Sequence, residues 1–500
     1  MSERNQSQGF DIVAAARRTM IENGFSADFP ADVTKEVAQL HGGVETTPGI
    51  KDLRNLLWSS IDNDDTRDLD QIEFAEETEN GGWRLYIGVA DVDSEVPKGS
   101  AIDAHAAAQT TTVYTGAVTF PMIPTELSTG ATSLFEGADR KSVMVEMVVG
   151  TDGTVKSVEI YRARVTNKAQ LTYSGVGNWI DSGAPIPAKV ASTATLESQL
   201  RLQAKIAVAL RKTRFDNGAL EIETVEARAV ADNGKVTGIE KTQKNTATDI
   251  IEDFMIAANA SVARFLEGHH VSAIRRIVRS PERWQRIVEL AKELGTDLPA
   301  EPDPMALHDF MLARRSADPD HFPDLSLAVV KLLGPGEYIL DQPGVEEPGH
   351  FGLAVQDYTH STAPNRRYAD LVTQRIVKAV LAAAPPPYTD DQLSEIARNC
   401  TLKEDAARKV EREVRKIAAA ILFSNRVGER FKAIVTGNKP SGTYVRVIDP
   451  PVEGRLMRGE KGVDVGDEIE VELLSTNPEK GFIDFGRVGE TPTPNPPGKR

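Results

Sequence analysis

The chain has 500 residues, 40% of them hydrophobic, and a formal net charge of −16. This length allows two to four domains with sizeable cores, and the lack of an uninterrupted apolar stretch of about 18 residues excludes a membrane span. The net charge argues against nucleic-acid binding over the whole surface, but it allows a local basic channel in an acidic shell.

The single cysteine, Cys400, excludes a disulfide within the chain, and its helical surroundings favour a small packed residue. The polar N-terminus, residues 1–8, lacks the apolar core of a signal peptide. These features predict a soluble, cytoplasmic protein.

Helical and strand-like patterns alternate along the chain and predict the α+β class. Residues 12–25 are predicted to be helical, and a second short helix follows Pro30 up to residue 41. Residues 50–165 mix strands and loops rich in Gly, Thr and Val, with a strand-like run at 83–92. Residues 190–335 are expected to be mostly helical, with one helix starting at Ser280 as N-cap and Pro281 as the first helical residue.

An acidic segment, residues 60–71, precedes the strand-like run and holds five carboxylates within nine residues: Asp62, Asp64, Asp65, Asp68 and Asp70. Like charges at this spacing repel unless a cation lies among them, and hard divalent cations take oxygen ligands. The simplest alternative is a solvated acidic loop. An EF-hand calcium loop is disfavoured, because Arg67 stands where that pattern needs Gly and a strand, rather than a helix, follows.

A second constellation lies at residues 358–371, where Arg366 and Arg367 follow Pro364 and open a predicted helix that ends near residue 383. Guanidinium forks and free N–H groups at a helix start form a phosphate-binding arrangement. The alternative is that both arginines pair with nearby Asp and Glu. Together with an acidic metal loop, the pair suggests phosphoryl transfer, with a metal on one side of a phosphodiester and arginine on the other.

Towards the C-terminus the predicted elements change from a long helix to short strands. A long helix is predicted from Thr389 to about residue 423, and five short strands with Gly turns follow at 431–435, 442–447, 454–456, 467–473 and 482–485, which is typical of an OB barrel. Two clusters of basic residues are expected on helices. Each is either a solvated helix face or part of the lining of an RNA channel. One cluster holds Arg275, Arg276, Arg279, Arg283 and Arg286, and the other holds Arg408, Lys409, Arg412, Arg415 and Lys416.

These motifs resemble the RNase II / RNase R family of exoribonucleases. The acidic segment resembles the family's metal motif, and residues 358–371 resemble its arginine motif. Shorter motifs fall between them in the family's order, at 89–92, 113–114, 121–124, 126–128, 138–140, 218–220 and 255–259. The resemblance covers roughly residues 50–420. It implies a mixed sheet-and-helix RNB catalytic domain at 50–423, a small helical region at 1–49, an RNA-binding OB domain at 424–488 and a disordered tail at 489–500.

The resemblance also implies roles for the site residues. Asp62, Asp68 and Asp70 fall on the positions that hold Mg²⁺, with Mn²⁺ as the alternative, and Asp70 is a catalytic position together with Arg366, which lies on the phosphate at the cut. The family's fourth carboxylate directly follows Asp70, and here that position is Gln71. An amide oxygen can ligate a hard cation, but it adds no charge.

Substrate-binding roles are implied at six further positions. Tyr114 falls where an aromatic stacks on the RNA and limits the length of the final product; its alternative is a packed core tyrosine. Glu411 matches a glutamate on the terminal ribose, although the alignment can slip to Glu413. Tyr358 is expected, with His360, to shape the site, and Arg367 is expected beside the phosphate. Phe431 and Tyr444 on the barrel are candidates for base stacking, and Arg446 is a candidate for phosphate contact. For Phe431, a place in the barrel core is at least as compatible with the sequence.

The expected activity is processive, hydrolytic 3′→5′ digestion of single-stranded RNA to nucleoside 5′-monophosphates by a monomer that does not bind membranes. Larger bacterial relatives carry two cold-shock-type OB domains before the catalytic domain, for which residues 1–49 leave no room. The main alternative is an RNA-binding protein whose metal site is disabled at Gln71. A nuclease acting on DNA is disfavoured by the resemblance.

Overall fold

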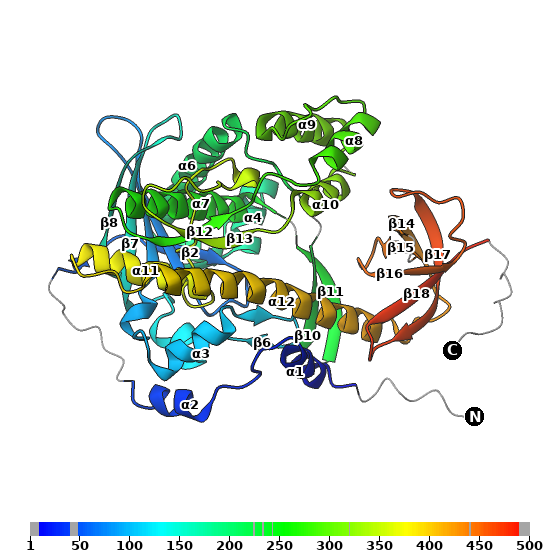
Figure 1. Ribbon diagram of the computed structural model, residues 1–500, viewed down its shortest axis with the longest axis horizontal. Coiled ribbons are helices and arrows are strands. Elements are labelled where there is room, and N and C mark those ends of the chain that lie inside the picture. The colour runs from blue at the N-terminus through cyan, green and yellow to red at the C-terminus, as the bar shows by residue number, and fades with distance from the viewer. Residues whose placement is uncertain are drawn as a thin grey trace.

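The computed structural model describes residues 10–40, 49–223, 226–232, 235–242, 244–319, 321–439 and 442–489. A central sheet with helices around it forms the main body, and the long helix α12 (Asp390–Phe423) runs from this body to a separate C-terminal barrel (Figure 1). The predicted α+β class is confirmed. No helix in the described part of the chain is long and apolar enough to cross a lipid bilayer.

The central sheet is mixed and has seven strands. In spatial order they are β1 (Lys51–Asp52), β8 (Val155–Thr166), β7 (Asp139–Val149), β4 (Trp83–Ala90), β3 (Gln71–Glu77), β2 (Ser59–Asp62) and β9 (Ala169–Thr172). The β1–β8 and β2–β9 pairs are parallel, and the others are antiparallel. The predicted strand at 83–92 is confirmed as β4, whose near-continuous burial reflects cover on both faces.

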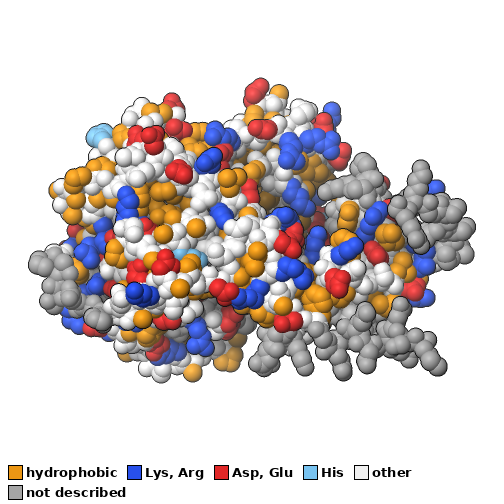
Figure 2. Space-filling model, turned by 60° about the horizontal axis from the view of Figure 1, so that its bottom comes forward, with side chains coloured by type: hydrophobic (Ala, Val, Ile, Leu, Met, Phe, Trp, Pro, Cys, Tyr) orange, Lys and Arg blue, Asp and Glu red, His pale blue; other side chains and the backbone are white. Residues whose placement is uncertain are grey.

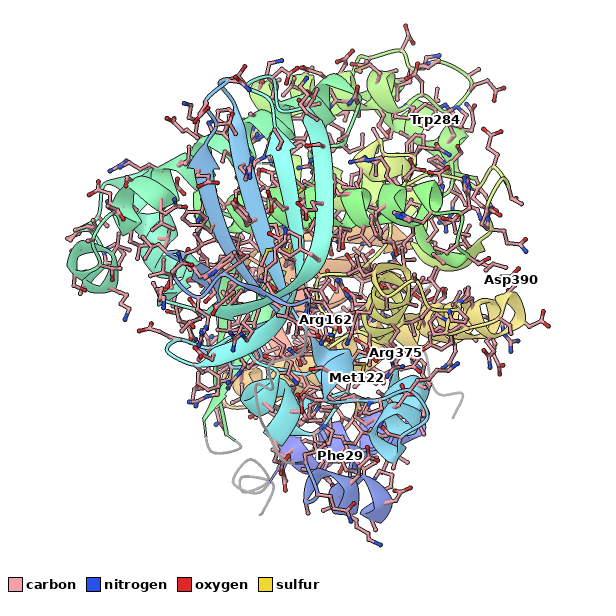
Figure 3. The ribbon with its side chains drawn as sticks, turned by 90° about the vertical axis from the view of Figure 1, so that its left-hand side faces the viewer. Phe29, Met122, Arg162, Trp284, Arg375 and Asp390 are labelled. Carbon is pink, nitrogen blue, oxygen red and sulfur yellow. The ribbon has the colours of Figure 1, made fainter. Side chains whose placement is uncertain are left out.

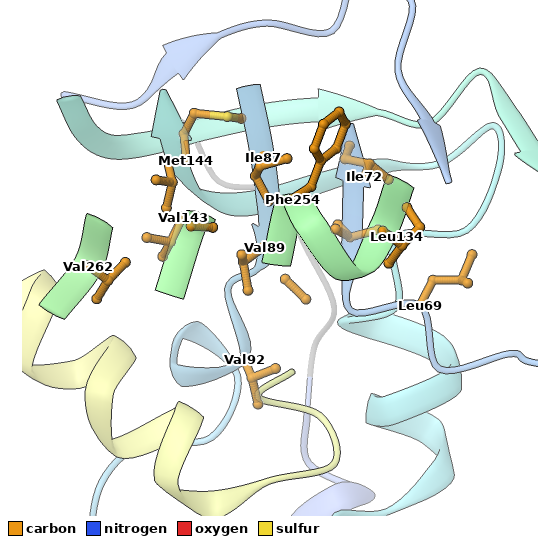
Figure 4. Close-up of a cluster of buried hydrophobic side chains, with 14 of the residues drawn as sticks. Leu69, Ile72, Ile87, Val89, Val92, Leu134, Val143, Met144, Phe254 and Val262 are labelled. Atoms are coloured by element: carbon orange, nitrogen blue, oxygen red, sulfur yellow. The ribbon is translucent and has the colours of Figure 1, made fainter. Parts of the chain in front are cut away.

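Helices cover one face of this sheet. The central one is α7 (Thr246–Gly268), which begins with a capping box formed by Asn245 and Thr248. Figure 4 shows Phe254 and Val262 of this helix packed against Val143 and other apolar side chains of the sheet. Further helices pack beside it or beside the sheet edge: α4 (Tyr173–Ser182), α5 (Ala188–Ser192) and α6 (Leu196–Asp216).

The two predicted N-terminal helices are confirmed as α1 (Ile12–Glu22) and α2 (Ala31–Val37). Helix α1 buries Ile12, Ala16 and Met20 in one cluster with apolar residues of α12. Helix α2 lies beside α3 (Ala101–Gln109). The short elements that follow α3 are β5 (Val113–Tyr114), β6 (Thr119–Phe120) and the π-helix Glu126–Ala131.

The segment between α7 and the arginine motif holds helices α8 (Trp284–Glu293), α9 (Pro304–Ala317) and α10 (Phe322–Leu333). The sequence analysis missed two antiparallel strand pairs. One is the hairpin of β10 (Glu226–Asp232) and β11 (Lys235–Thr242), which precedes α7; in the other, β12 (Ala273–Ile277) pairs with β13 (Glu337–Asp341) from either side of these three helices.

The arginine-rich helix predicted around residues 275–286 is wrong. Arg275 and Arg276 lie on β12 and are buried in ion pairs, Arg275 with Asp341 at 2.9 Å and Arg276 with Glu404 at 2.6 Å. The predicted helix start at Ser280 is also wrong, because α8 begins at Trp284. The first error arises because residues 273–277 are paired with a strand some 60 residues further along the chain, which local propensity does not reveal.

The long helix and the barrel confirm the remaining predictions. Thr389 caps α12 through a capping box with Gln392. The barrel is closed in the order β14 (Arg430–Lys439), β15 (Gly442–Val447), β16 (Glu453–Arg458), β18 (Phe482–Arg487) and β17 (Glu468–Asn477). The end of α12 enters its core through Ala420 and Phe423, so α12 connects the barrel rigidly to the main body. The predicted disordered tail lies, apart from Gly489, outside the described residues.

Candidate active site

A buried carboxylate joins the two motifs. Asp70 precedes β3, and its Oδ1 accepts a hydrogen bond of 2.8 Å from the backbone N–H of Asn365. Its Oδ2 lies 3.6 Å from Nε of Arg366. The acidic segment and the arginine motif, 295 residues apart in the sequence, therefore meet at one point.

Two backbone segments hold Arg366 in place. The N–H of Thr112 donates to the carbonyl of Arg366 at 2.9 Å, and the N–H of Tyr368 donates to the carbonyl of Thr110 at 2.8 Å. These bonds tie the arginine motif to the strand that carries Tyr114. Helix α11 (Tyr368–Leu381) begins one residue after Arg367, so the arginines lie on the turn before the helix rather than in its first turn.

An ionic network fixes α11 against the sheet. Asp91, next to β4, accepts from Lys378 of α11 at 2.7 Å and from Arg162 of β8 at 3.1 Å. On the same helix, Arg375 pairs with Asp103 at 2.7 Å. Figure 3 shows Arg162 and Arg375 at the lower end of the sheet, beside α11. This network anchors α11, which directly follows the arginine motif, to the sheet and to α3.

The two arginines have different surroundings. The guanidinium of Arg367 binds Asp370 with two contacts of 2.8 Å, and Asp370 is fully buried. Arg366 keeps 44% of its side chain exposed beside Asp70. The local-pairing alternative therefore holds for Arg367. Both arginines line the cavity described below, and Arg366 is the more exposed of the two.

The acidic side chains lie in a poorly solvated setting. Burial raises the pKa of Asp70 to about 8, against the attraction of Arg366. Burial also raises the pKa of Asp62, opposed by hydrogen bonds from the backbone of Asn63 and the hydroxyl of Thr66. A divalent cation beside them would favour the ionised forms.

Tyr114 and Glu411 complete one wall of the site. The hydroxyl of Tyr114 donates to Asp68 Oδ2 at 2.8 Å, and its backbone N–H donates to Glu411 Oε1 at 3.1 Å. Tyr114 is 42% exposed, so the packed-core alternative for this residue is wrong. These contacts place the ring of Tyr114 and the carboxylates of Asp68 and Glu411 around one opening.

A cavity of about 200 Å³ lies between these groups. Its lining includes Tyr114, Tyr338, His360, Arg366, Arg367, Cys400, Glu404, Arg408 and Glu411. Nδ1 of His360 and the hydroxyl of Tyr338 are 2.7 Å apart, and burial with nearby arginines lowers the pKa of His360 well below its usual range. His360 is therefore neutral and shapes the cavity, as expected.

Three predicted substrate residues need correction or qualification. Tyr358 is buried in a small apolar cluster with Ile256 and does not line the cavity, so it supports the site from behind. Phe431 is 7% exposed and packs on Phe423 and Phe485 in the barrel core, so the expectation that it stacks on bases is wrong. Tyr444 is 36% exposed on β15 and stays a candidate.

Phe431 gives a stability prediction. We expect Phe431→Ala to lower the free energy of opening of the barrel by about 3–5 kcal/mol, because it leaves a cavity in a close-packed core. Phe482→Ala removes an equal side chain that is 59% exposed on β18, and it should change this energy by less than about 1 kcal/mol. Hydrogen exchange of the barrel amides measures both; equal effects would contradict the core assignment.

Several site groups were missed by the sequence analysis. Asn365 supplies the N–H on Asp70, and its side chain accepts from Thr132. Tyr338 comes from β13, and no sequence signal marks it. Asp370 lies three residues after Arg367, a spacing at which an ion pair was foreseeable.

The donor set fits a hard divalent cation. In the described residues no three His, Cys, Asp or Glu side chains lie close enough to hold a metal by themselves. Mg²⁺, however, is commonly bound through one or two carboxylates with the rest of its shell from water and substrate phosphate, and every candidate ligand here is an oxygen. Glu73, on β3, also has both carboxylate oxygens buried without a partner.

Both the acidic segment and the arginine motif lie within a region that matches a known protein family. The RNB domain family matches residues 50–383, more than half of the chain. The chain belongs to the RNB family. The RNase II-type exonuclease C-terminal S1 domain matches residues 429–488, which coincide with the barrel. The resemblance to the RNase II / RNase R family is therefore confirmed.

Individual relatives agree with this assignment. Ribonuclease R of Escherichia coli K12 is 30% identical over 508 residues, which cover 94% of this chain and 62% of the relative. The chain thus spans less than two thirds of that relative's length. The identity with this relative therefore does not show that the chain has the relative's whole activity.

Solved structures show the same RNB fold. RNase R of Mycoplasma genitalium matches 96% of this chain and 78% of its own with a TM-score of 0.85 at 22% identity. Yeast Ssd1, a pseudonuclease, matches 94% of this chain and 58% of its own with a TM-score of 0.70 at 18% identity. At these identities the likeness shows the fold alone, and the fold occurs in both nucleases and a pseudonuclease.

Proposed function

We propose that this RNB-family protein is a hydrolytic, metal-dependent 3′→5′ exoribonuclease that degrades single-stranded RNA processively to nucleoside 5′-monophosphates. The observation that carries the proposal is the meeting of Asp70 and Arg366, 3.6 Å apart, at the edge of a narrow cavity. The relatives named Ribonuclease R support it, as do the RNA complexes of the Mycoplasma genitalium enzyme.

The carboxylates act on one side of the scissile phosphate. Asp62, Asp68 and Asp70 are the proposed ligands of Mg²⁺, with Mn²⁺ as the alternative; when bound, the cation would polarise the phosphate and make water a stronger nucleophile. Asp70 is held by the N–H of Asn365, so its orientation is set before substrate arrives. The hydroxyl of Tyr114 donates to Oδ2 of Asp68 alone, so the second carboxylate oxygen could serve a cation while this bond is kept.

Arg366 acts on the other side. Its exposed guanidinium can bind a non-bridging phosphate oxygen through a planar fork and stabilise the negative charge that develops there. Arg367 keeps the turn rigid through its buried pair with Asp370. The two neighbouring arginines thus have separate tasks, one on the phosphate and one on the backbone.

The cavity explains attack at an RNA end. The cavity of about 200 Å³ lies beside Arg366 and Glu411, where we propose that the terminal nucleotide of the RNA binds. Glu411 can accept hydrogen bonds from ribose hydroxyls, which is a physical means of preferring RNA over DNA. The half-exposed ring of Tyr114 offers a stacking surface beside it.

Helix α12 offers a route for the RNA. It lines the cavity at Arg408 and Glu411 and enters the barrel core at Phe423, about 18 Å further along the helix at 1.5 Å per residue. The basic cluster Arg408, Lys409, Arg412, Arg415 and Lys416 lies on this helix, as predicted. Figure 2 shows Lys and Arg side chains between the main body and the barrel, interspersed with Asp and Glu.

Product analysis tests the proposed reaction. We expect uniformly labelled single-stranded RNA to yield nucleoside 5′-monophosphates with Mg²⁺, no product with EDTA, and no product from DNA of the same sequence. Nucleoside 3′-monophosphates, cleavage in EDTA, or digestion of DNA would each contradict it.

Gln71 gives a second test of the metal site. We expect Gln71→Asp to tighten Mg²⁺ binding or raise the rate, because a buried carboxylate adds negative charge to an oxygen site. Titration of activity and heat against Mg²⁺ measures both quantities. Unchanged values would mean that residue 71 is not a ligand in this protein.

The alternative of a catalytically inactive RNA-binding protein rests on Gln71 and on the occurrence of this fold in a pseudonuclease. It predicts RNA that is bound and not cut. The domain limits 50–423 and 424–488, the monomeric state and the cytoplasmic location stay predictions.

A further inference from the structure

Glu73 is a buried acid without a visible partner. It lies on β3 with no exposed surface, and neither carboxylate oxygen has a hydrogen-bond partner. Directly across on β2, Ser59 also buries a hydroxyl without a partner. A carboxylate taken out of water in this way needs a proton or a cation to be tolerated.

The surroundings of Glu73 are negative. Burial raises its pKa well above the usual range, and the nearby carboxyl of Asp62 raises it further. Tyr173, the first residue of α4, has its pKa raised by burial and by both of these acids, so the three groups lie near one another. In the described part of the chain, Glu73 has no ion pair with a Lys or Arg.

Strand register connects Glu73 to the metal motif. Side chains two residues apart on a strand share a face, so Gln71 and Glu73 point to the same side of β3. Ser59 lies on that side too, because it is paired with Glu73 across the ladder. One face of two neighbouring strands thus presents an amide oxygen, a carboxylate and a hydroxyl. Asp62 is the last residue of β2, and its carboxyl is near enough to raise the pKa of Glu73.

We propose that Glu73 is a metal ligand that shares a divalent cation with Asp62 and supplies the negative charge that Gln71 does not. The inference rests on the proposed metal-dependent function and adds a residue to its site. An all-oxygen set with two carboxylates, an amide and a hydroxyl suits a hard cation such as Mg²⁺ or Mn²⁺. The cation would balance the two buried acids and give the orphaned oxygens a partner.

Manganese binding to the RNA-free full-length chain tests the assignment. We expect Glu73→Gln, which keeps the size of the side chain and removes its charge, to weaken Mn²⁺ binding at least ~10-fold in calorimetry, in line with the loss of one charged ligand. Glu77→Gln makes the same change at an exposed position of the same strand, and its affinity should stay within about two-fold of wild type. Wild-type affinity in Glu73→Gln would overturn the proposal and leave a protonated or water-bound acid in its place.

Two further variants separate a ligand from a structural role. Thermal unfolding in EDTA should show Glu73→Gln at least as stable as wild type, since an unpartnered acid is removed, whereas the rise in Tm on adding Mn²⁺ should be lost. The double variant Gln71→Asp/Glu73→Gln moves the carboxylate along the same face and should regain affinity. Failure of this rescue, or a full Mn²⁺ rise in Tm for Glu73→Gln, would overturn the ligand role.

The outcome is distinguishable from a failure of the proposed function. RNA cleavage by wild type together with normal Mn²⁺ binding by Glu73→Gln rejects Glu73 alone. Mn²⁺ binding that depends on Glu73, in a protein that cuts no RNA, supports the ligand and rejects the exonuclease. A wild-type chain that binds no Mn²⁺ rejects both.

Discussion

Replacing Asp70 with Asn is expected to lower RNA turnover by roughly 10³-fold or more while RNA binding is retained. Asn keeps the shape of the side chain but brings no negative charge, so the cation site and its pull on the phosphate are both weakened. Asp70 is buried and accepts from the backbone of Asn365, and an amide oxygen can accept that same bond. The fold should therefore survive the substitution.

Single-turnover digestion and a gel-shift titration measure the two effects of Asp70→Asn separately. Asp309→Asn makes the same chemical change at an exposed position of α9, far along the chain from either motif, and should leave the rate within about two-fold of wild type. A rate for Asp70→Asn within ten-fold of wild type would remove Asp70 from the chemistry. Loss of RNA binding together with the rate would point to misfolding instead.

Arg366→Lys is expected to lower turnover by about 10²–10³-fold, the second large effect. Lysine keeps the positive charge but presents a point charge in place of a planar fork, so it cannot bind two phosphate oxygens at once. Arg366 is 44% exposed and its recorded ion pair is the long contact to Asp70, so the substitution should leave stability almost unchanged.

Arg367→Lys is the matched control, and we expect it to affect stability instead of the phosphate contact. Arg367→Lys breaks a two-point contact with the fully buried Asp370, and we expect it to lower the stability of the main body by about 1–3 kcal/mol. Chemical denaturation and single-turnover rates of both variants form the test. If Arg366→Lys lost stability and kept its rate, the assignment of Arg366 to the phosphate and of Arg367 to the fold would be contradicted.

Local signals predicted much of the fold. Thr389 marked the start of α12 correctly, and short strands separated by Gly turns indicated the barrel. These features depend on neighbours in sequence. Strand β12 was mistaken for a helix because it is held by β13 and by ion pairs to Asp341 and Glu404, which lie far along the chain.

The site was predictable only where its residues belong to motifs that the sequence itself shows. Clustered charge and the family resemblance brought Asp70 and Arg366 together correctly, and the structure places Tyr114 and Glu411 beside them. Sequence does not say whether an aromatic residue at a strand start points inward, so Phe431 was a candidate both for RNA stacking and for the barrel core, and it belongs to the core. Glu73 was not predicted as a site residue because β3 carries three glutamates, Glu73, Glu76 and Glu77, and only the structure shows which of them is buried.

The most direct measurement is a time course with 5′-labelled single-stranded RNA and Mg²⁺, resolved on a gel beside Asp70→Asn. We expect wild type to convert full-length RNA to a short end product without a ladder of intermediates, and the variant to leave the RNA intact. Intact RNA with wild type that is nonetheless shifted in a binding gel would contradict the exonuclease and support an RNA-binding protein disabled at Gln71.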